Sequence, residues 1–126
     1  MPVSSRILYV DDNKDSCEVV SAMLPLYSDW KYSVTSCETA DIAISLMKKQ
    51  AFDVYILDYA LPDISGVELC EIIRRTDAET PILFFTGKTQ EADRKNAINA
   101  GASEYLVKPN DLIKLVETVK HLMNEK

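Results

Sequence analysis

Five polar side chains stand directly after short apolar runs of the sequence, where they could act together chemically. They are three carboxylates, one hydroxyl and one ammonium group: Asp11, Asp12, Asp58, Thr86 and Lys108. Two carboxylates about 4 Å apart repel each other by roughly 1–4 kcal/mol near a protein surface. A site that gathers three of them therefore requires either a raised pKa or a bound cation.

A magnesium ion and a phosphoryl group suit these side chains best. Mg²⁺ prefers oxygen ligands, needs only one or two carboxylates, and keeps waters and phosphate oxygens in its shell. Lys108 would bring a point charge to a phosphoryl group, and the Thr86 hydroxyl could donate a hydrogen bond to it. Asp58 is then the expected nucleophile, because carboxylates form aspartyl-phosphates while metal and lysine neutralise charge in an in-line transfer.

Each of these residues also has a purely structural interpretation. An acidic pair after a strand often forms a turn, with Asn13 or Asp15 as the N-cap of the next helix. Thr86 could cap a helix, and Lys108 with its following proline could begin one. Taken singly, these structural roles are the commoner ones. Their coincidence after four strands favours a shared site.

The sequence alternates short apolar runs with longer amphipathic segments. The apolar runs, mostly rich in β-branched or aromatic residues, predict strands at Arg6–Val10, Tyr32–Ser36, Val54–Leu57, Ile82–Phe85 and Tyr105–Val107. The amphipathic segments predict helices at Lys14–Leu24, Thr39–Lys49, Gly66–Thr76, Gln90–Ala100 and Asp111–Asn124. Pro25 is expected to end the first helix or kink its last turn, and Gly101 to be the C-cap of the fourth.

This alternation predicts the fold class. Five strands and five helices in turn indicate right-handed βαβ units, and hence an α/β domain with a doubly wound parallel sheet and helices on both faces. All strands of such a sheet end at one edge, and ligands bind beyond their carboxyl ends. The five polar side chains are therefore expected to meet at that edge. A chain of 126 residues is long enough to bury its own core as one domain.

Composition narrows the function classes. The formal charge of −6 argues against direct nucleic-acid binding, which needs a basic footprint. Three cysteines without close pairing suggest neither a disulfide framework nor a zinc site, and fit reduced thiols in a cytoplasmic protein. No apolar run reaches membrane-spanning length, and the N-terminus lacks the apolar core of a signal peptide.

Four segments match a known family in order and spacing. They are Ile7–Asn13 (ILYVDDN), Leu57–Gly66 (LDYALPDISG), Pro81–Gly87 (PILFFTG) and Ala100–Pro109 (AGASEYLVKP). On these segments the chain resembles the receiver domain of two-component response regulators, and residues 1–126 are expected to form a single receiver domain. The resemblance implies a flavodoxin-like fold with strand order 2-1-3-4-5.

The resemblance also implies the chemistry of the acidic residues. Asp58 would accept a phosphoryl group from a phosphohistidine. Asp12 and Asp58 would ligate Mg²⁺ directly, together with the backbone carbonyl of Ala60, and Mn²⁺ could substitute for Mg²⁺. Asp11 would act through a bound water. The protein would then be a phosphoacceptor that assists its own phosphorylation and slow dephosphorylation, and not an enzyme.

A conformational switch is implied as well. Lys108 would pair with the phosphoryl group, and Thr86 would move towards it. Tyr105 matches the aromatic switch position of the family, whose ring turns inward and remodels the face formed by the fourth helix, fifth strand and fifth helix. The peptide bond before Pro109 is expected to be cis. Ala60 leaves room for a hydrolytic water, on which Lys88 could act.

Partners follow from the same resemblance. A histidine kinase or a histidine phosphotransfer protein would donate the phosphoryl group. A downstream effector protein, or a covalently linked output domain outside this chain, would receive the signal. The chain is expected to be a monomer when unphosphorylated, and a dimer through the fourth helix, fifth strand and fifth helix could form on activation.

Three other functions compete with this hypothesis. A haloacid-dehalogenase-type phosphatase needs a second aspartate two residues after its nucleophile, but Ala60 stands there after Asp58. A flavodoxin-type binding module needs a phosphate loop rich in Ser, Thr and Gly, whereas the acidic residues 11–12 would repel a flavin phosphate. A pseudo-receiver that works without phosphate remains as the alternative, and the presence of all residues expected for phosphorylation disfavours it.

Overall fold

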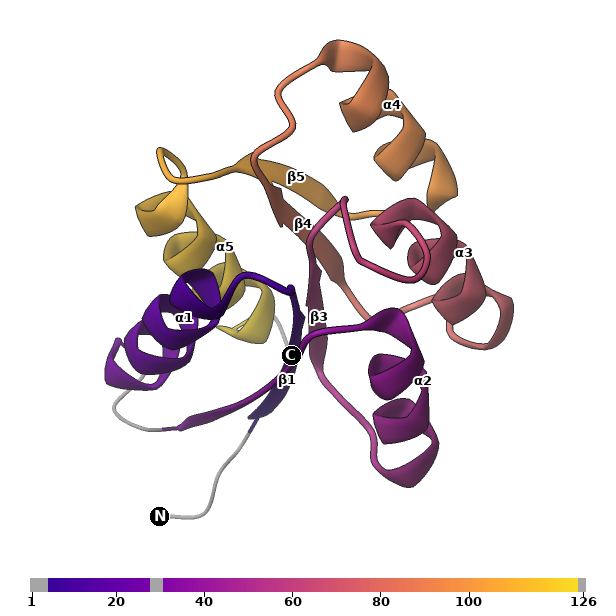
Figure 1. Cartoon of the computed structure of the whole chain (residues 1–126). Helices are drawn as coiled ribbons and strands as arrows, with labels where there is room; N and C mark the ends of the chain where they lie inside the picture. The colour runs from indigo at the N-terminus through magenta and orange to yellow at the C-terminus, as the bar shows by residue number, and fades with distance from the viewer. Residues whose placement is uncertain (1–4, 28–30, 125–126) are drawn as a thin grey trace.

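The computed structural model of the protein describes residues 5–27 and 31–124. Within these residues, five parallel strands form one sheet in the order β2-β1-β3-β4-β5 (Figure 1). The strands are β1 (Ser5–Val10), β2 (Tyr32–Cys37), β3 (Val54–Leu57), β4 (Ile82–Thr86) and β5 (Glu104–Val107). The helices are α1 (Lys14–Leu26), α2 (Ala40–Lys49), α3 (Gly66–Thr76), α4 (Glu91–Ala100) and α5 (Leu112–Asn124). The predicted flavodoxin-like, doubly wound architecture is confirmed.

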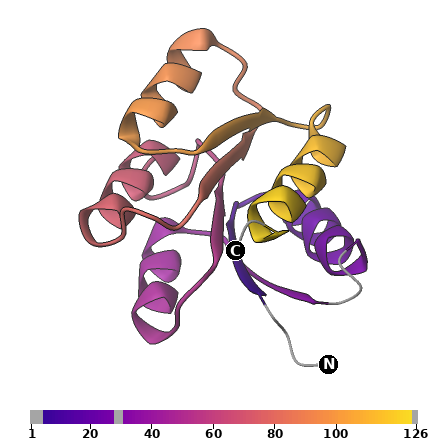
Figure 2. The ribbon, with the colours of Figure 1, turned by 180° about the vertical axis from the view of Figure 1, so that it is seen from behind.

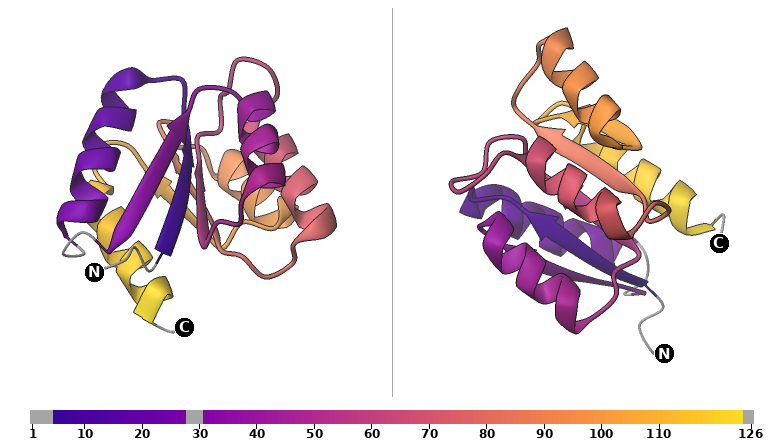
Figure 3. Two further views of the ribbon diagram at one scale, coloured as in Figure 1. Left: turned by 90° about the horizontal axis from the view of Figure 1, so that it is seen from below. Right: turned by 90° about the vertical axis from the view of Figure 1, so that its right-hand side faces the viewer.

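Helices cover both faces of the sheet. Helices α1 and α5 lie side by side on one face, and α2, α3 and α4 lie on the other (Figures 2 and 3). Each interface has its own cluster of buried apolar side chains. Along β1 successive residues alternate between them, so that Ile7 and Tyr9 join one cluster and Leu8 and Val10 the other, all four fully buried. A strand buried on both faces is the arrangement that its unbroken apolar run predicts.

Most predicted element boundaries shift by a residue or two. Strand β3 and helix α3 keep their predicted bounds. Helices α2 and α4 begin one residue late, because Thr39 and Gln90 have extended backbone and stand as N-caps outside the helices. The predicted C-cap is confirmed at Gly101, whose φ of 116° lies in the left-handed region that glycine reaches without strain.

Helix α1 differs from its prediction at the C-terminal end. It does not stop before Pro25 but runs on to Leu26. A proline removes a single backbone donor, so in the last turn it costs one helical hydrogen bond. The helical pattern continues past the proline, since the backbone N–H of Tyr27 donates to the carbonyl of Met23 at 3.0 Å.

Candidate functional site

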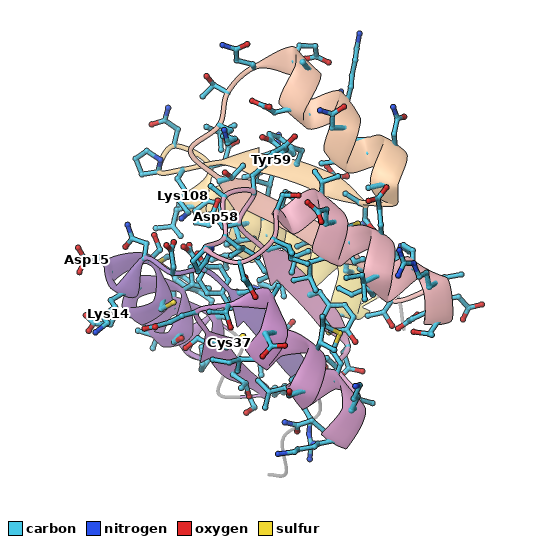
Figure 4. All side chains as sticks on the ribbon, turned by 45° about the vertical axis from the view of Figure 1, so that its right-hand side comes forward. Lys14, Asp15, Cys37, Asp58, Tyr59 and Lys108 are labelled. Atoms are coloured by element: carbon cyan, nitrogen blue, oxygen red, sulfur yellow. The ribbon has the colours of Figure 1, made fainter. Side chains whose placement is uncertain are left out.

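The carboxyl ends of four strands bring the five predicted polar residues to one edge of the sheet. Asp11 follows β1, Asp58 follows β3, Thr86 ends β4 and Lys108 follows β5. Asp11 and Thr86 are buried, Asp58 is 8% exposed, and Asp12 is exposed. Figure 4 shows Asp58 and Lys108 next to each other at this edge.

The three carboxylates form a cluster that suits a hard divalent cation. Asp11, Asp12 and Asp58 each offer one oxygen, and these oxygens lie within 4.8 Å of one another. This is the one such acidic, cysteine or histidine group of three or more within the described residues. Its members run from buried to exposed, so the cluster opens to solvent on the side of Asp12. Oxygen donors with one open side fit Mg²⁺, which retains water ligands.

Lys108 compensates only part of this negative charge. Its Nζ lies 2.5 Å from Oδ2 of Asp11 and 3.3 Å from Oδ2 of Asp58. Burial by itself lowers the pKa of Lys108, but the hydrogen bond to Asp11 and the attraction of Asp58 outweigh burial and raise it. Lys108 therefore stays protonated. One ammonium against three carboxylates still leaves an excess of negative charge, which a divalent cation would neutralise.

The surroundings of Asp58 shift the pKa of its carboxyl. Burial raises its pKa, and repulsion by Asp11 adds to the effect. The hydrogen bond from the Thr86 hydroxyl and the attraction of Lys108 oppose these influences without cancelling them. A partly desolvated carboxylate with a raised pKa is more basic than one in water, which is the direction that favours attack on an electrophile.

Asp11 is fixed by neighbours that sequence reasoning missed. The Tyr9 hydroxyl donates to its Oδ2 at 2.7 Å, and the backbone N–H of Asn13 donates to its Oδ1 at 2.9 Å. Burial and the Asp11 carboxylate both raise the pKa of Tyr9, so the hydroxyl remains a donor. The spacing could have suggested the contact, because residues two apart in a strand point to the same side of the sheet.

Some of these residues have the structural roles that the sequence also allowed, and others do not. Asn13 does cap α1, since its Oδ1 accepts a hydrogen bond from the backbone N–H of Ser16 at 3.0 Å. Thr86 does not cap α4, whose N-cap is Gln90. Asp111, the predicted first residue of the last helix, stands just before α5, and its carboxylate accepts a hydrogen bond from the backbone N–H of Val107 at 2.8 Å.

The predicted switch residue Tyr105 connects the sheet to the loop after β4. Its ring is stacked on Phe84 with 5.9 Å between centroids, and its hydroxyl donates to the backbone carbonyl of Lys88 at 2.9 Å. Burial, with smaller effects of nearby acidic groups, raises the pKa of Tyr105 to about 12. The peptide bond between Lys108 and Pro109 is cis, as expected.

A second aromatic residue, Tyr59, follows Asp58 directly and was not anticipated. Its hydroxyl accepts a hydrogen bond from the Asn96 side chain of α4 at 3.3 Å. The Lys88 ammonium lies 5.4 Å from the centre of the Tyr59 ring, and that ring also contacts Phe84. The residue after Asp58 thus touches α4, although nothing in the local sequence pattern marks it.

Comparison with known proteins places the chain in a family. The model of the response regulator receiver domain matches residues 7–120. The chain belongs to this family. No helix within the described parts of this receiver domain is long and apolar enough to cross a membrane.

Individual relatives agree with that assignment. The transcriptional regulatory protein DltR of Streptococcus agalactiae is 32% identical over 115 residues, which cover 91% of this receiver domain and 50% of DltR. The crystal structure of a two-component response regulator from Clostridium difficile superposes with a TM-score of 0.88 at 28% identity, covering 96% of this chain and 97% of that one. The BeF3-activated DrrB receiver domain gives a TM-score of 0.84 at 31% identity, covering 95% and 97%. The chain spans about half the length of the curated response regulators that it matches.

Proposed function

We propose that this receiver domain takes a phosphoryl group from a phosphohistidine onto Asp58 in a Mg²⁺-dependent reaction, and signals through the change of shape that follows. The observation that carries the proposal is the meeting of three carboxylates and Lys108 at one edge of the sheet. Family membership over residues 7–120 supports it, because receiver domains typically bind Mg²⁺ beside an acceptor aspartate.

In this proposal each residue of the cluster has one task. Asp58 attacks phosphorus with a carboxylate oxygen while the bond from phosphorus to the histidine nitrogen breaks. Asp12, Asp58 and the Ala60 backbone carbonyl would hold Mg²⁺, and Asp11 would act on it through a bound water. The metal supplies positive charge to the phosphoryl oxygens. Lys108 would neutralise charge on a phosphoryl oxygen.

Lys108 would change partners in this reaction. Its ammonium now lies against Asp11 and Asp58. With a divalent cation bound to those carboxylates, the ammonium would be free to pair with a phosphoryl group. The Thr86 hydroxyl, which now donates a hydrogen bond to Asp58, would instead donate to a phosphoryl oxygen. The Tyr105 hydroxyl is hydrogen-bonded to the loop after β4, which would move together with Thr86.

The partners and setting of the reaction are proposals too. The donor is a histidine kinase or a histidine phosphotransfer protein, and the signal passes to an effector protein or to a linked output domain. The length of relatives such as DltR, about twice that of this chain, supports a linked domain. The acidic charge favours protein over nucleic-acid partners, and the free thiols of Cys17, Cys37 and Cys70 favour the cytoplasm.

The remaining proposals concern domain and assembly. We take residues 1–126 as a single receiver domain, monomeric before phosphorylation. Activation would alter the face formed by α4, β5 and α5, where Tyr105 contacts the loop that leads into α4. A dimer through that face on activation would appear as a change in sedimentation coefficient after phosphorylation.

Intact-mass spectrometry with a small phosphodonor tests the proposed chemistry. The protein is incubated with acetyl phosphate, with and without Mg²⁺, beside Asp58→Asn. A gain of one phosphoryl group that requires both Mg²⁺ and Asp58 is the expected result. A folded wild-type protein that binds Mg²⁺ yet takes no phosphoryl group, from acetyl phosphate or from phosphorylated histidine kinases, would instead support the phosphate-independent pseudo-receiver.

A further inference from the structure

The loop between β3 and α3 makes a bidentate contact with a distant helix. Asp63 lies in this loop, and its carboxylate accepts two backbone hydrogen bonds from the first turn of α2. Ala40 N–H donates to Oδ1 at 3.1 Å, and Asp41 N–H donates to Oδ2 at 2.9 Å. The carboxylate therefore satisfies two of the backbone donors that a helix N-terminus leaves without partners.

Helix α2 has its own N-cap in addition to this contact. The Thr39 hydroxyl accepts the backbone N–H of Ile42 at 3.1 Å. Asp63 lies 23 residues after Ala40 and 22 residues after Asp41, so its contact joins the β3–α3 loop to α2 as well as capping that helix. Burial is the largest single influence on the pKa of Asp63 and raises it, but the backbone donors together outweigh burial and lower the pKa, which keeps the carboxylate charged at neutral pH.

A backbone hydrogen bond joins the two ends of this loop and closes its neck. The backbone N–H of Gly66 donates to the carbonyl of Tyr59 at 2.7 Å. Ala60 lies between this closed neck and Asp63, which joins the loop to α2. The loop is thus held at two places, one on each side of Ala60, whose carbonyl is the backbone ligand in the proposed metal site.

We propose that Asp63 is a positioning residue for the divalent-cation site: its contact with α2 holds the loop so that the Ala60 carbonyl faces the acidic cluster. The inference rests on the proposed function, since it needs the cation at Asp12, Asp58 and Ala60. It assigns to Asp63 no contact with the cation itself. Because coupling between two sites is reciprocal, cation binding also steadies the first turn of α2.

Mg²⁺ titration by isothermal calorimetry, without phosphodonor, tests this role. Asp63→Ala removes both acceptors and is expected to raise the Kd for Mg²⁺ by about 10-fold, the lower end of the roughly 10- to 100-fold loss seen when supporting residues of metal sites are removed. Asp63→Asn keeps one carbonyl acceptor and should give an intermediate value. It also serves as the second variant if Asp63→Ala is poorly folded.

Thr39→Ala is the matched control. It removes a cap from the same helical turn but leaves the loop contact in place, so it is expected to lower stability while changing the Kd for Mg²⁺ less than about twofold. Amide hydrogen exchange gives an independent readout. Mg²⁺ should slow exchange at Ala40 and Asp41 in the wild-type protein but not in Asp63→Ala.

The outcomes separate this inference from the proposed function. If the wild-type protein binds Mg²⁺ and takes a phosphoryl group, but Asp63→Ala binds Mg²⁺ equally well, the positioning role is refuted and the proposed function stands. Equal losses of Mg²⁺ affinity in Asp63→Ala and Thr39→Ala would assign the effect to the stability of α2 and also refute it. A folded wild-type protein without Mg²⁺ affinity would overturn both.

Discussion

Gly66 closes the β3–α3 loop and packs so tightly there that even alanine should not fit without a shift of the backbone. A Cβ atom added at Gly66 would lie 3.0 Å from the carbonyl carbon of Asp58, closer still to its oxygen, and 3.1 Å from Cε2 of Phe84. The Asp58 atoms are backbone at the end of a buried strand, so they cannot rotate away as the end of a side chain could. Gly66→Ala must therefore move the loop or the strand.

The size of the effect follows from two opposing contributions. Alanine in place of glycine favours a helix by up to about 1 kcal/mol in a helix interior, and by less at this first position of α3. Overpacking against rigid neighbours costs typically about 1–3 kcal/mol and sometimes more. Because the closest neighbour here is backbone, we expect a net loss near the upper end, about 2–3 kcal/mol. For a domain of this size that lowers Tm by about 6–15 °C.

Thermal and urea unfolding, followed by circular dichroism, measure this loss. Gly87→Ala is the matched control, because a Cβ atom at Gly87 meets no heavy atom within 4 Å. Its stability should stay within about 0.5 kcal/mol of the wild-type value. If Gly66→Ala unfolds at the same temperature as Gly87→Ala, the close packing of the loop on Asp58 is refuted as a constraint.

Three further predictions concern single side chains. Arg74 donates to three backbone carbonyl oxygens at 2.8–3.0 Å. A lysine at this position cannot reach all three, so Arg74→Lys should lower the free energy of unfolding by about 1–3 kcal/mol in a urea titration. An unchanged urea midpoint would contradict this. Tyr105→Phe loses the hydrogen bond to Lys88 and should cost about 0.5–1.5 kcal/mol by the same assay, whereas an equal or higher stability would argue against that bond. The pKa of Asp58 is raised in the folded protein, so ionisation of this carboxyl destabilises the fold. Without Mg²⁺, the stability of the wild-type protein relative to Asp58→Asn should therefore fall as the pH rises from the pKa of an unfolded aspartate, about 4, to the pKa of folded Asp58. Asp58→Asn should thus be the more stable protein at pH 7 by roughly 0.5–2 kcal/mol, with the difference vanishing at acidic pH; a difference that does not depend on pH would contradict the assignment.

The positions of the strands in the sequence were enough to predict both the fold and the polar residues that meet at the edge of the sheet. Strands buried on both faces are continuous apolar runs, and parallel strands end at one edge of the sheet. Asp11, Asp58, Thr86 and Lys108 stand at those ends, so their meeting follows from topology alone. No knowledge of side-chain conformation was needed.

The contacts that support the cluster could not be predicted in this way. The hydrogen bonds from α2 to Asp63 join a helix and a loop residue more than 20 positions apart, and such contacts between a side chain and the backbone have no periodic pattern. The contact of Tyr59 with Asn96 depends on where α4 packs, which sequence spacing does not specify. The predicted end of α1 was two residues short, because Pro25 removes one backbone donor but does not end the helix, which runs on to Leu26.

The most direct test of the central claim is to locate the phosphoryl group on the chain. After reaction with acetyl phosphate and Mg²⁺, borohydride reduces an aspartyl-phosphate to homoserine, and peptide mass spectrometry identifies the reduced residue. We expect homoserine at position 58, and its loss when Mg²⁺ is chelated before the phosphodonor is added. Homoserine at another aspartate, or an undiminished yield without Mg²⁺, would contradict Mg²⁺-dependent phosphorylation of Asp58.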